Sequence, residues 1–282
     1  MPGESGIVQR MTDVSRLVFG LVAAAGDGAA ATRFEELAAW MKAHAALDLE
    51  RRTAPTYYDL AMSVRQSESD VAWLPPVSYA WLAEAVTPLG SIVRDGRTSY
   101  SSALVVPAGS AFRTLHDLQG ARAAWVDPWS AAGYVVPRLE LAAAGIDPRA
   151  MFRAETFHGS HREVLAALGR GECDVAGTYA RTRYDGDATV EGAWSELPDL
   201  DVRVLTIFGS IPPDVLVVRR SLAPAPYERA LAAFRAACAD EGARPLVRAL
   251  FGGDELREGI EPGHATLRFA YEGAVANGLF DD

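Results

Sequence analysis

Apolar residues along the chain occur both as short unbroken runs and as longer amphipathic stretches. Runs such as RLVFGLVAAA at 16–25 and DVAWLP at 70–75 are typical of buried strands, because they are short and bounded by turn residues. The stretches at 31–47 and 162–171 repeat apolar residues every three or four positions, which predicts helices. Strands that alternate with covering helices predict an α/β fold with mixed, mostly parallel sheets and helices on both faces.

The same pattern predicts elements along most of the chain. Further strands are predicted at 48–54, 99–107, 122–127, 173–179, 201–208 and 214–220. Further helices are predicted at 57–66, 115–120, 133–145 and 226–240. Gly145 ends the third of these helices, and Pro137 is tolerated in it because it lies near the helix start. The sequence has no internal repeat, low-complexity tract or long linker.

The charge balance limits the classes of partner. With a formal net charge of −10, the chain has no basic stripe for nucleic acid and is disfavoured at an anionic membrane surface. No apolar run has the length of a membrane span, so membrane insertion is not expected. A local pocket can still hold one small anion. Without a proper secretory signal the chain as written is expected to be cytoplasmic; removal of a signal would leave the same sequence in a periplasmic or extracellular protein.

Two scarce residue types argue against a bound cofactor or metal. Lys42 is the only lysine and lies in a predicted helix, so a Schiff-base cofactor has one unpromising attachment point. Cys173 and Cys238 lie in apolar strand-like and helix-like sequence, which favours buried free thiols over a disulfide or a metal site. No cofactor is expected.

Three short motifs suggest other chemistries. GDGAAA at 26–31 matches the G-x-G-x-x-A pattern of dinucleotide folds, but its first glycine lies beyond the natural end of the strand. HGSHRE at 158–163 has two histidines that could ligate a metal with a third residue, but this loop-to-helix junction also suits a helix cap. Ser130, His161 and Asp127 could form a hydrolytic triad, but no nucleophile-elbow pattern supports one.

The stretch DPWSAAGYVVPRLEL at 127–141 predicts a helix that begins among small residues. Free backbone N–H groups at a helix N-terminus and the helix dipole favour a bound anion. Ser130 is the one serine or threonine in the stretch, and an N-cap serine without a ligand is the simpler interpretation. The rest of the sequence shifts the balance toward an anion site.

Four collinear segments carry a more specific pattern. They are TYYDLAMSVRQSESDVAWLPPVSYA at 56–80, the segment 99–148 that contains VDPWSAAGYVVPRLELAAAGIDP, FHGSHREVLAALGRGECDVAGTY at 157–179, and FGSIPPDVLVVRRSL at 208–222. Together they resemble the phosphate, phosphite and phosphonate substrate-binding proteins of ABC transporters, the PhnD-like branch of the type II periplasmic-binding fold. The resemblance runs collinearly from residue 16 to residue 225, and the C-terminal helices carry no motif.

The resemblance implies a two-lobe fold with the ligand in a cleft between the lobes. Lobe 1 would comprise residues 14–104 and 214–282, and lobe 2 would comprise residues 105–213. It also implies capture of a small anionic ligand without chemical change, with an ABC transporter permease as a candidate partner.

The resemblance further implies which residues meet the ligand. The family's contact positions correspond to Tyr57, Tyr100, Ser130, Ala131, Ala132, His161, Arg181 and Asp214. The family has three hydroxyl residues where this chain has Ser130 and two alanines, so two donors are missing, each worth about 1.5–3 kcal/mol when charge-assisted. Arg181 stands where aminophosphonate binders have a carboxylate. Trp129 adds an apolar face that could stack on a planar ligand.

Two hypotheses follow for the function. The first is a binding protein for a phosphonate-like, phosphate-like or carboxylate-bearing metabolite, with no catalytic residues. The second is a cytoplasmic enzyme on the same fold, similar to enzymes of menaquinone and thiamine precursor biosynthesis, in which His161 and Asp214 would act as acid–base groups. The sequence shows no committed catalytic pair, which favours binding.

Overall fold

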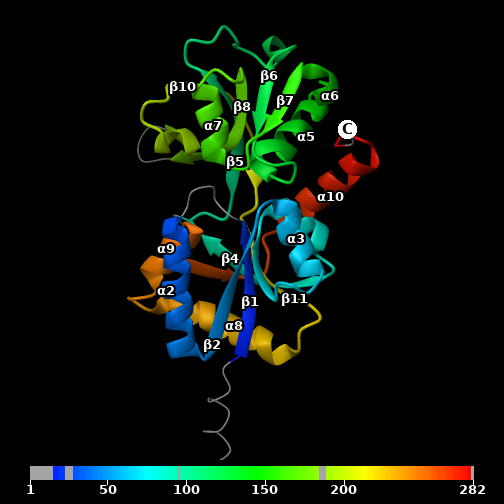
Figure 1. Ribbon diagram of the computed structural model, residues 1–282. Coiled ribbons are helices and arrows are strands. Elements are labelled where there is room, and N and C mark those ends of the chain that lie inside the picture. Colours follow the sequence, from blue (N-terminus) through cyan, green and yellow to red (C-terminus); the bar gives the residue numbers. More distant parts are fainter. Residues whose placement is uncertain (1–14, 23–27, 95, 184–188, 281–282) are drawn as a thin grey trace, which may run out of the picture. The chain divides into compact units, whose positions relative to one another are not determined.

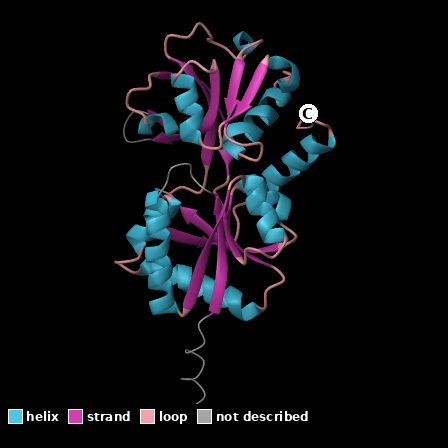
Figure 2. Ribbon diagram, viewed as in Figure 1, coloured by secondary structure: helices cyan, strands magenta, loops and turns pink. Residues whose placement is uncertain are grey.

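The computed structural model describes residues 15–22, 28–94, 96–183 and 189–280. The chain forms two compact units (Figure 1). Unit 1 comprises Met1–Leu74, Trp81–Thr98 and Pro213–Ile260, and unit 2 comprises Pro75–Ala80, Ser99–Pro212 and Glu261–Asp282. Each unit contains one sheet flanked by helices (Figure 2). The predicted two-lobe α/β fold class is confirmed.

Unit 1 is built on a six-stranded sheet with the strand order β12-β4-β11-β3-β1-β2. Its strands are β1 (Ser15–Val22), β2 (Leu47–Ala54), β3 (Val71–Leu74), β4 (Val86–Val93), β11 (Val215–Arg219) and β12 (Glu255–Glu258). Its helices are α2 (Gly28–Ala45), α3 (Tyr57–Arg65), α8 (Pro224–Ala239) and α9 (Arg244–Phe251).

The period-two pattern of β1 assigns the two faces of this sheet. Phe19 is buried among α2, α8 and α9, with its ring centroid 5.4 Å from Phe34 and 6.1 Å from Phe234. Gly20 points to the opposite face, where a Cβ would lie 2.8 Å from a methyl group of Leu60 in α3. Adjacent residues of one strand therefore pack against helices on opposite sides of the sheet, as expected for a fully covered strand.

Unit 2 has a six-stranded sheet in the order β10-β5-β8-β6-β7, with β9 paired to β8. Its strands are β5 (Tyr100–Pro107), β6 (Arg122–Trp125), β7 (Ala154–Phe157), β8 (Val175–Arg183), β9 (Thr189–Gly192) and β10 (Val202–Ile211). Its helices are α5 (Val136–Ala143), α6 (Pro148–Met151), α7 (His161–Gly169) and α10 (Gly263–Ala276). The short helix α4 (Pro76–Leu82) spans the boundary between the two units in the sequence.

The sheets are mixed, but the expectation that they are mostly parallel is wrong. Among the described strands four ladders are parallel and six are antiparallel. The strand β11 lies antiparallel between β3 and β4, and β5 lies antiparallel between β10 and β8. Parallel neighbours need a crossover connection, which is usually a helix. The strands β5 and β11 each follow another strand with no intervening helix, so their connections do not require parallel pairing.

Some elements differ from the predicted ones. The strand β4 was not predicted, because Pro88 and Gly90 interrupt its apolar run. The strands β7 and β12 were missed because each has one partly buried residue among exposed ones. The helix predicted at 115–120 is a three-residue 3₁₀ turn, and residues 23–25 of the first predicted strand lie outside the described residues.

The C-terminal helix α10 packs within unit 2. Leu267 is buried in the same apolar cluster as Phe208 and Ile211 of β10, and the Tyr271 ring lies 5.5 Å from Phe280. The predicted lobe 1 included all of 214–282, whereas the contacts group Glu261–Asp282 with unit 2. The predicted boundary after residue 104 also falls inside β5, which belongs to unit 2. Across the described residues, no helix combines the length and apolar composition needed to cross a bilayer.

Candidate anion-binding site

Ser130 begins the helical segment that the sequence predicted. Its Oγ accepts a hydrogen bond from the Gly133 N–H at 3.0 Å, which makes it the N-cap. The segment starts as a π-helical turn (Ala131–Val135), in which the Val135 N–H donates to the Ser130 carbonyl at 2.9 Å, and continues as α5. The Ser130 side chain is buried. Its oxygen accepts from the helix, so its O–H hydrogen is the part that can donate to a ligand.

Small residues let this helix start lie directly against the sheet. A Cβ on Gly133 would lie 2.3 Å from Val126, and a Cβ on Gly177 of β8 would lie 2.6 Å from the Trp125 ring. Ala131 and Ala132 are each 2% exposed and belong to the apolar cluster of unit 2. The buried Ser102 hydroxyl donates to the Ala132 carbonyl at 2.6 Å. The two alanines therefore belong to a closely packed backbone junction.

The turn before Ser130 is ordered by Asp127. A carboxylate oxygen of Asp127 accepts from the Trp129 N–H at 2.7 Å, and its carbonyl accepts from the Ser130 N–H at 2.9 Å. Such Asx turns hold a loop in one conformation just before a helix. Trp129 is half-buried against the unit 2 cluster, so packing already accounts for part of its apolar surface.

His161 is the first residue of α7, directly after its N-cap. The Ser160 Oγ accepts from the Glu163 N–H at 3.2 Å, so the expected helix cap is confirmed. The Nδ1 atom of His161 lies 3.0 Å from the Oγ1 of Thr178, which is fully buried on β8. Within the described residues no group of three or more His, Cys, Asp or Glu side chains could hold a metal ion. The hydrogen-bond partner of the His161 Nδ1 atom is the Thr178 hydroxyl.

Arg181 lies over an aromatic ring beside His161. Its guanidinium carbon is 5.2 Å from the Tyr179 ring centroid, and the His161 ring meets the same ring edge-on at 5.0 Å. The Tyr179 hydroxyl donates to Glu196 at 2.8 Å, which orients the ring. The structure therefore brings His161 and Arg181 together around Tyr179. The contact between Thr178 and His161 was not predicted, because a threonine within a strand carries no distinguishing pattern.

Two junctions of strand end and helix start, and the end of a third strand, lie at one edge of the unit 2 sheet. The strands β6, β7 and β8 are mutually parallel, so their carboxyl ends share this edge. The helical segment capped by Ser130 follows β6, α7 follows β7, and Arg181 is near the end of β8. Ligands of open α/β sheets bind at the carboxyl edge of the strands. Tyr100 begins the neighbouring strand β5, whose Ser101 pairs with Ala180 of β8.

Two of the predicted residues belong to unit 1. Tyr57 is the first residue of α3, after the N-cap Thr56, whose Oγ1 accepts from the Asp59 N–H at 3.0 Å. The Asp214 carboxylate pairs with Arg94 at 2.9 Å, and Arg94 also donates to a backbone carbonyl of α9. The roles of Tyr57 and Asp214 toward a ligand stay predictions.

Both cysteines are free thiols, as expected, but only Cys173 is buried, and Cys238 is partly exposed. Burial away from water raises the pKa of Cys173 to about 12 and that of Cys238 to about 11. The thiolate form is the reactive one. Neither cysteine is therefore suited to nucleophilic chemistry near neutral pH.

The fold has many solved counterparts. A binding protein component of an ABC phosphonate transporter from Pseudomonas aeruginosa is 19% identical with a TM-score of 0.76, covering 94% of this chain and 89% of its own. PhnD1 from Prochlorococcus marinus in complex with methylphosphonate is 13% identical with a TM-score of 0.76, covering 92% and 98%. A Xanthomonas citri protein bound to ATP is 20% identical with a TM-score of 0.74, covering 93% and 98%.

This chain therefore shares its two-lobe α/β fold with these proteins. The model of the family described as "ABC transporter, phosphonate, periplasmic substrate-binding protein" matches residues 19–261. The chain belongs to this family, and its function is that of a substrate-binding protein for a small anionic ligand.

Proposed function

We propose that this chain captures a phosphonate-like oxyanion in the periplasm and delivers it to an ABC transporter permease. Family membership supports the capture role and the transporter partner. The observation that carries the ligand class is the convergence of Ser130, His161 and Arg181 at the carboxyl edge of the unit 2 sheet. Two helix starts and a guanidinium there favour negative charge. The enzyme hypothesis is not pursued, because the family is one of substrate-binding proteins.

Thr178 determines which ring nitrogen of His161 carries the proton. Among the described residues, its buried hydroxyl has one hydrogen-bond partner, the His161 Nδ1 atom. A buried O–H hydrogen without an acceptor costs about 1–3 kcal/mol, whereas an unused oxygen lone pair costs less. Thr178 therefore donates to Nδ1, and the neutral imidazole carries its proton on Nε2. Thr178 is a positioning residue that makes His161 a hydrogen-bond donor for an oxyanion.

Arg181 restricts the ligand further. A guanidinium next to the anion attracts a second negative or hydrogen-bond-accepting group and repels an ammonium group. The preferred ligands are therefore phosphonates, phosphoesters or phosphonocarboxylates without an amino group. Methylphosphonate, bound by the Prochlorococcus counterpart, is the simplest probe. The comparison ligand is 2-aminoethylphosphonate, whose ammonium group should weaken binding.

Calorimetric titration of the purified chain tests the proposal. Methylphosphonate and phosphonoacetate are expected to bind, with 2-aminoethylphosphonate at least tenfold weaker, a difference of about 1.4 kcal/mol. Arg181→Glu should reverse that order, whereas Arg170→Gln, at the far end of α7, should leave it unchanged. If none of these anions gives a binding signal at a concentration of about 10 mM, any Kd is weaker than a capture protein can use, and anion capture is refuted.

The role of Thr178 is tested separately, in the ligand-free protein. The ¹⁵N chemical shifts of His161 are expected to show the Nε2–H tautomer in the wild type and in Thr178→Ser, which retains the hydroxyl. Thr178→Val keeps the shape but removes the donor, so the Nε2–H population should fall and methylphosphonate should bind about tenfold more weakly, a loss of about 1.4 kcal/mol. An Nδ1–H tautomer in the wild type would overturn the assignment whether or not any anion binds.

A further inference from the structure

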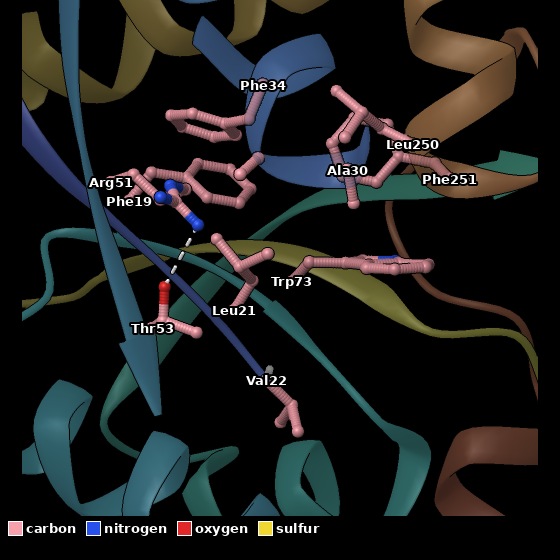
Figure 3. A pocket seen from close by; sticks show the side chains of 11 residues that line it. Phe19, Leu21, Val22, Ala30, Phe34, Arg51, Thr53, Trp73, Leu250 and Phe251 are labelled. Carbon is pink, nitrogen blue, oxygen red and sulfur yellow. Dashed lines mark hydrogen bonds between the residues drawn. The ribbon is translucent and has the colours of Figure 1, made fainter. Parts of the chain in front are cut away.

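Unit 1 contains an apolar pocket that has no part in the proposed anion site. We call it the α2 pocket; its volume is about 180 Å³. Figure 3 shows its side chains, which come from β1, β2, β3, the first turns of α2 and the end of α9. The lining residues are Phe19, Leu21, Val22, Ala30, Ala31, Phe34, Arg51, Thr53, Trp73, Leu250 and Phe251.

Aromatic rings form the inner wall of the α2 pocket. Phe19, Phe34 and Phe251 are buried, with the Phe19 ring 5.4 Å from Phe34 and 6.3 Å from Phe251. Trp73 is only partly buried and meets the Phe251 ring edge-on at 5.0 Å. Rings that already hold one another in tilted and edge-on arrangements are a preorganised surface for another aromatic ring.

The pocket exists because α2 begins with small side chains. Residues 47 and 49 of β2 are buried beneath α2, and Arg51 and Thr53 continue the same face of that strand. Of the α2 residues that line the pocket, Ala30 and Ala31 have only a methyl side chain, whereas Phe34 lies one turn further along the helix. The alanines of the GDGAAA motif thus line a pocket far too small for a dinucleotide.

The polar groups of the α2 pocket are confined to one side. Arg51 and Thr53 are the two polar lining residues, and an Arg51 N–H donates to the Thr53 Oγ1 at 3.3 Å (Figure 3). Arg51 also lies 3.5 Å from Glu35, whose side chain is 64% exposed. A pair this exposed to water is worth about 1 kcal/mol or less, so a ligand carboxylate can compete with Glu35 for the guanidinium.

We propose that the α2 pocket binds a monocyclic aromatic carboxylate of the size of benzoate. The ring would lie against Phe19, Phe34 and Trp73, and the carboxylate would accept hydrogen bonds from Arg51 and Thr53. The size fits, because an apolar protein cavity of about 150 Å³ accommodates benzene. The charge of the ligand also fits the lining. The carboxylate would meet Arg51 and Thr53, and the ring would meet the other lining residues, which are all apolar.

Titration with benzoate, followed by calorimetry, tests this site. Benzoate is expected to bind the wild type, and Arg51→Met should weaken it at least tenfold, about 1.4 kcal/mol. Arg52→Met is the matched control: it removes the same charge from the adjacent position of β2, on the opposite face, where Arg52 pairs with Glu68. Glu35→Gln removes the competing carboxylate and should tighten binding.

Filling the pocket gives an independent readout. Ala31→Leu places a good helix former in α2 and occupies the space of the ring, so it should abolish benzoate binding while circular dichroism remains native. His161→Ala and excess methylphosphonate should both leave benzoate binding unchanged, which separates this site from the anion site. The proposal is overturned if the wild type does not bind benzoate at about 10 mM, or if Arg51→Met and Ala31→Leu bind it as the wild type does.

Discussion

Each unit has a helix that begins with small residues after a strand, α2 after β1 and the Ser130 segment after β6, but the two helix starts are packed in opposite ways. In unit 1, α2 begins with Gly-Ala-Ala-Ala at 28–31, and Ala30 and Ala31 line a pocket. In unit 2, the helical segment begins with Ser-Ala-Ala-Gly at 130–133, and its alanines are buried against the sheet. The side chains that the strands present decide whether small residues leave a space or close one.

The two interiors also differ in polarity. Among the described residues, the buried polar side chains of unit 1 are the serines Ser63, Ser69 and Ser91. The buried polar side chains of unit 2 include Asp127, Arg138, Thr178 and His264. Buried polar groups are stable only when they are paired. Unit 2 therefore depends on specific partners, whereas unit 1 depends more on apolar packing.

Removal of the buried cation of unit 2 should have the largest effect. The Arg138 side chain is 2% exposed, and its guanidinium makes two hydrogen bonds to Glu155, at 2.8 and 3.0 Å. Arg138→Met leaves the Glu155 carboxylate without its cation, so the free energy of unfolding should fall by about 3 kcal/mol. Urea denaturation measures this change.

The counterpart in unit 1 is Arg94→Met. Arg94 pairs with Asp214, but both side chains are about one-fifth exposed, at 23% and 19%. Water already competes for the guanidinium of Arg94, whose side chain is 23% exposed where that of Arg138 is 2% exposed, so we expect a loss of about 1–2 kcal/mol. Equal losses for the two variants would contradict the difference in polarity between the two interiors.

A single methyl group tests the packing of the two helix starts. Gly133→Ala places a Cβ 2.3 Å from Val126 and 2.8 Å from the Ser130 Oγ, so unit 2 should lose about 1–3 kcal/mol of stability. Gly28→Ala meets nothing within 4 Å and should change stability by less than about 0.5 kcal/mol. Thermal unfolding of both variants gives the comparison. A destabilising Gly28→Ala would show that the α2 start is as closely packed as its counterpart.

The last comparison concerns the pH dependence of stability. Each unit has an aspartate just before a strand, Asp70 before β3 and Asp174 before β8. In unit 1, the Asp70 carboxylate accepts hydrogen bonds from the Val18 N–H at 2.9 Å and from Arg219 at 3.0 Å. In unit 2, the Asp174 carboxylate accepts from the backbone N–H of Arg122 at 2.8 Å and from the Arg122 guanidinium at 2.7 Å. The side-chain hydrogen bond from Arg122 is the largest cause that lowers the pKa of Asp174 below its ordinary value of 3.8.

The sign of the pH dependence follows from that lowered pKa. Asp174 stabilises the fold above the unfolded pKa, and this contribution is lost as the pH falls through the lower folded pKa. Asp174→Asn should therefore lower the Tm at pH 7, by the equivalent of about 1 kcal/mol, and the difference from wild type should shrink below about pH 3. A difference that persists undiminished in acid would mean that the carboxylate charge is not its cause.

Part of the candidate site could be predicted from the sequence, because Ser130 and His161 lie at helix starts. Ser130 and Ser160 are N-caps in the structure, and His161 follows the second cap. Capping depends on residues within one turn, so a local pattern is enough to recognise it. The same locality explains why the amphipathic helices and buried strands were recognised, whereas β4, with a proline and a glycine in its apolar run, was not.

Residues far apart in the sequence decided the remaining features. Thr178 lies 17 positions from His161, and only the packing of α7 on β8 brings the two together. The orientation of β5 and β11, the grouping of α10 with unit 2 and the α2 pocket also depend on which surfaces meet. The sequence by itself determined the class of fold, the helix starts and the family. The tertiary structure alone decided the contact between His161 and Thr178 and the pocket beneath the start of α2, because both depend on contacts that no local pattern records.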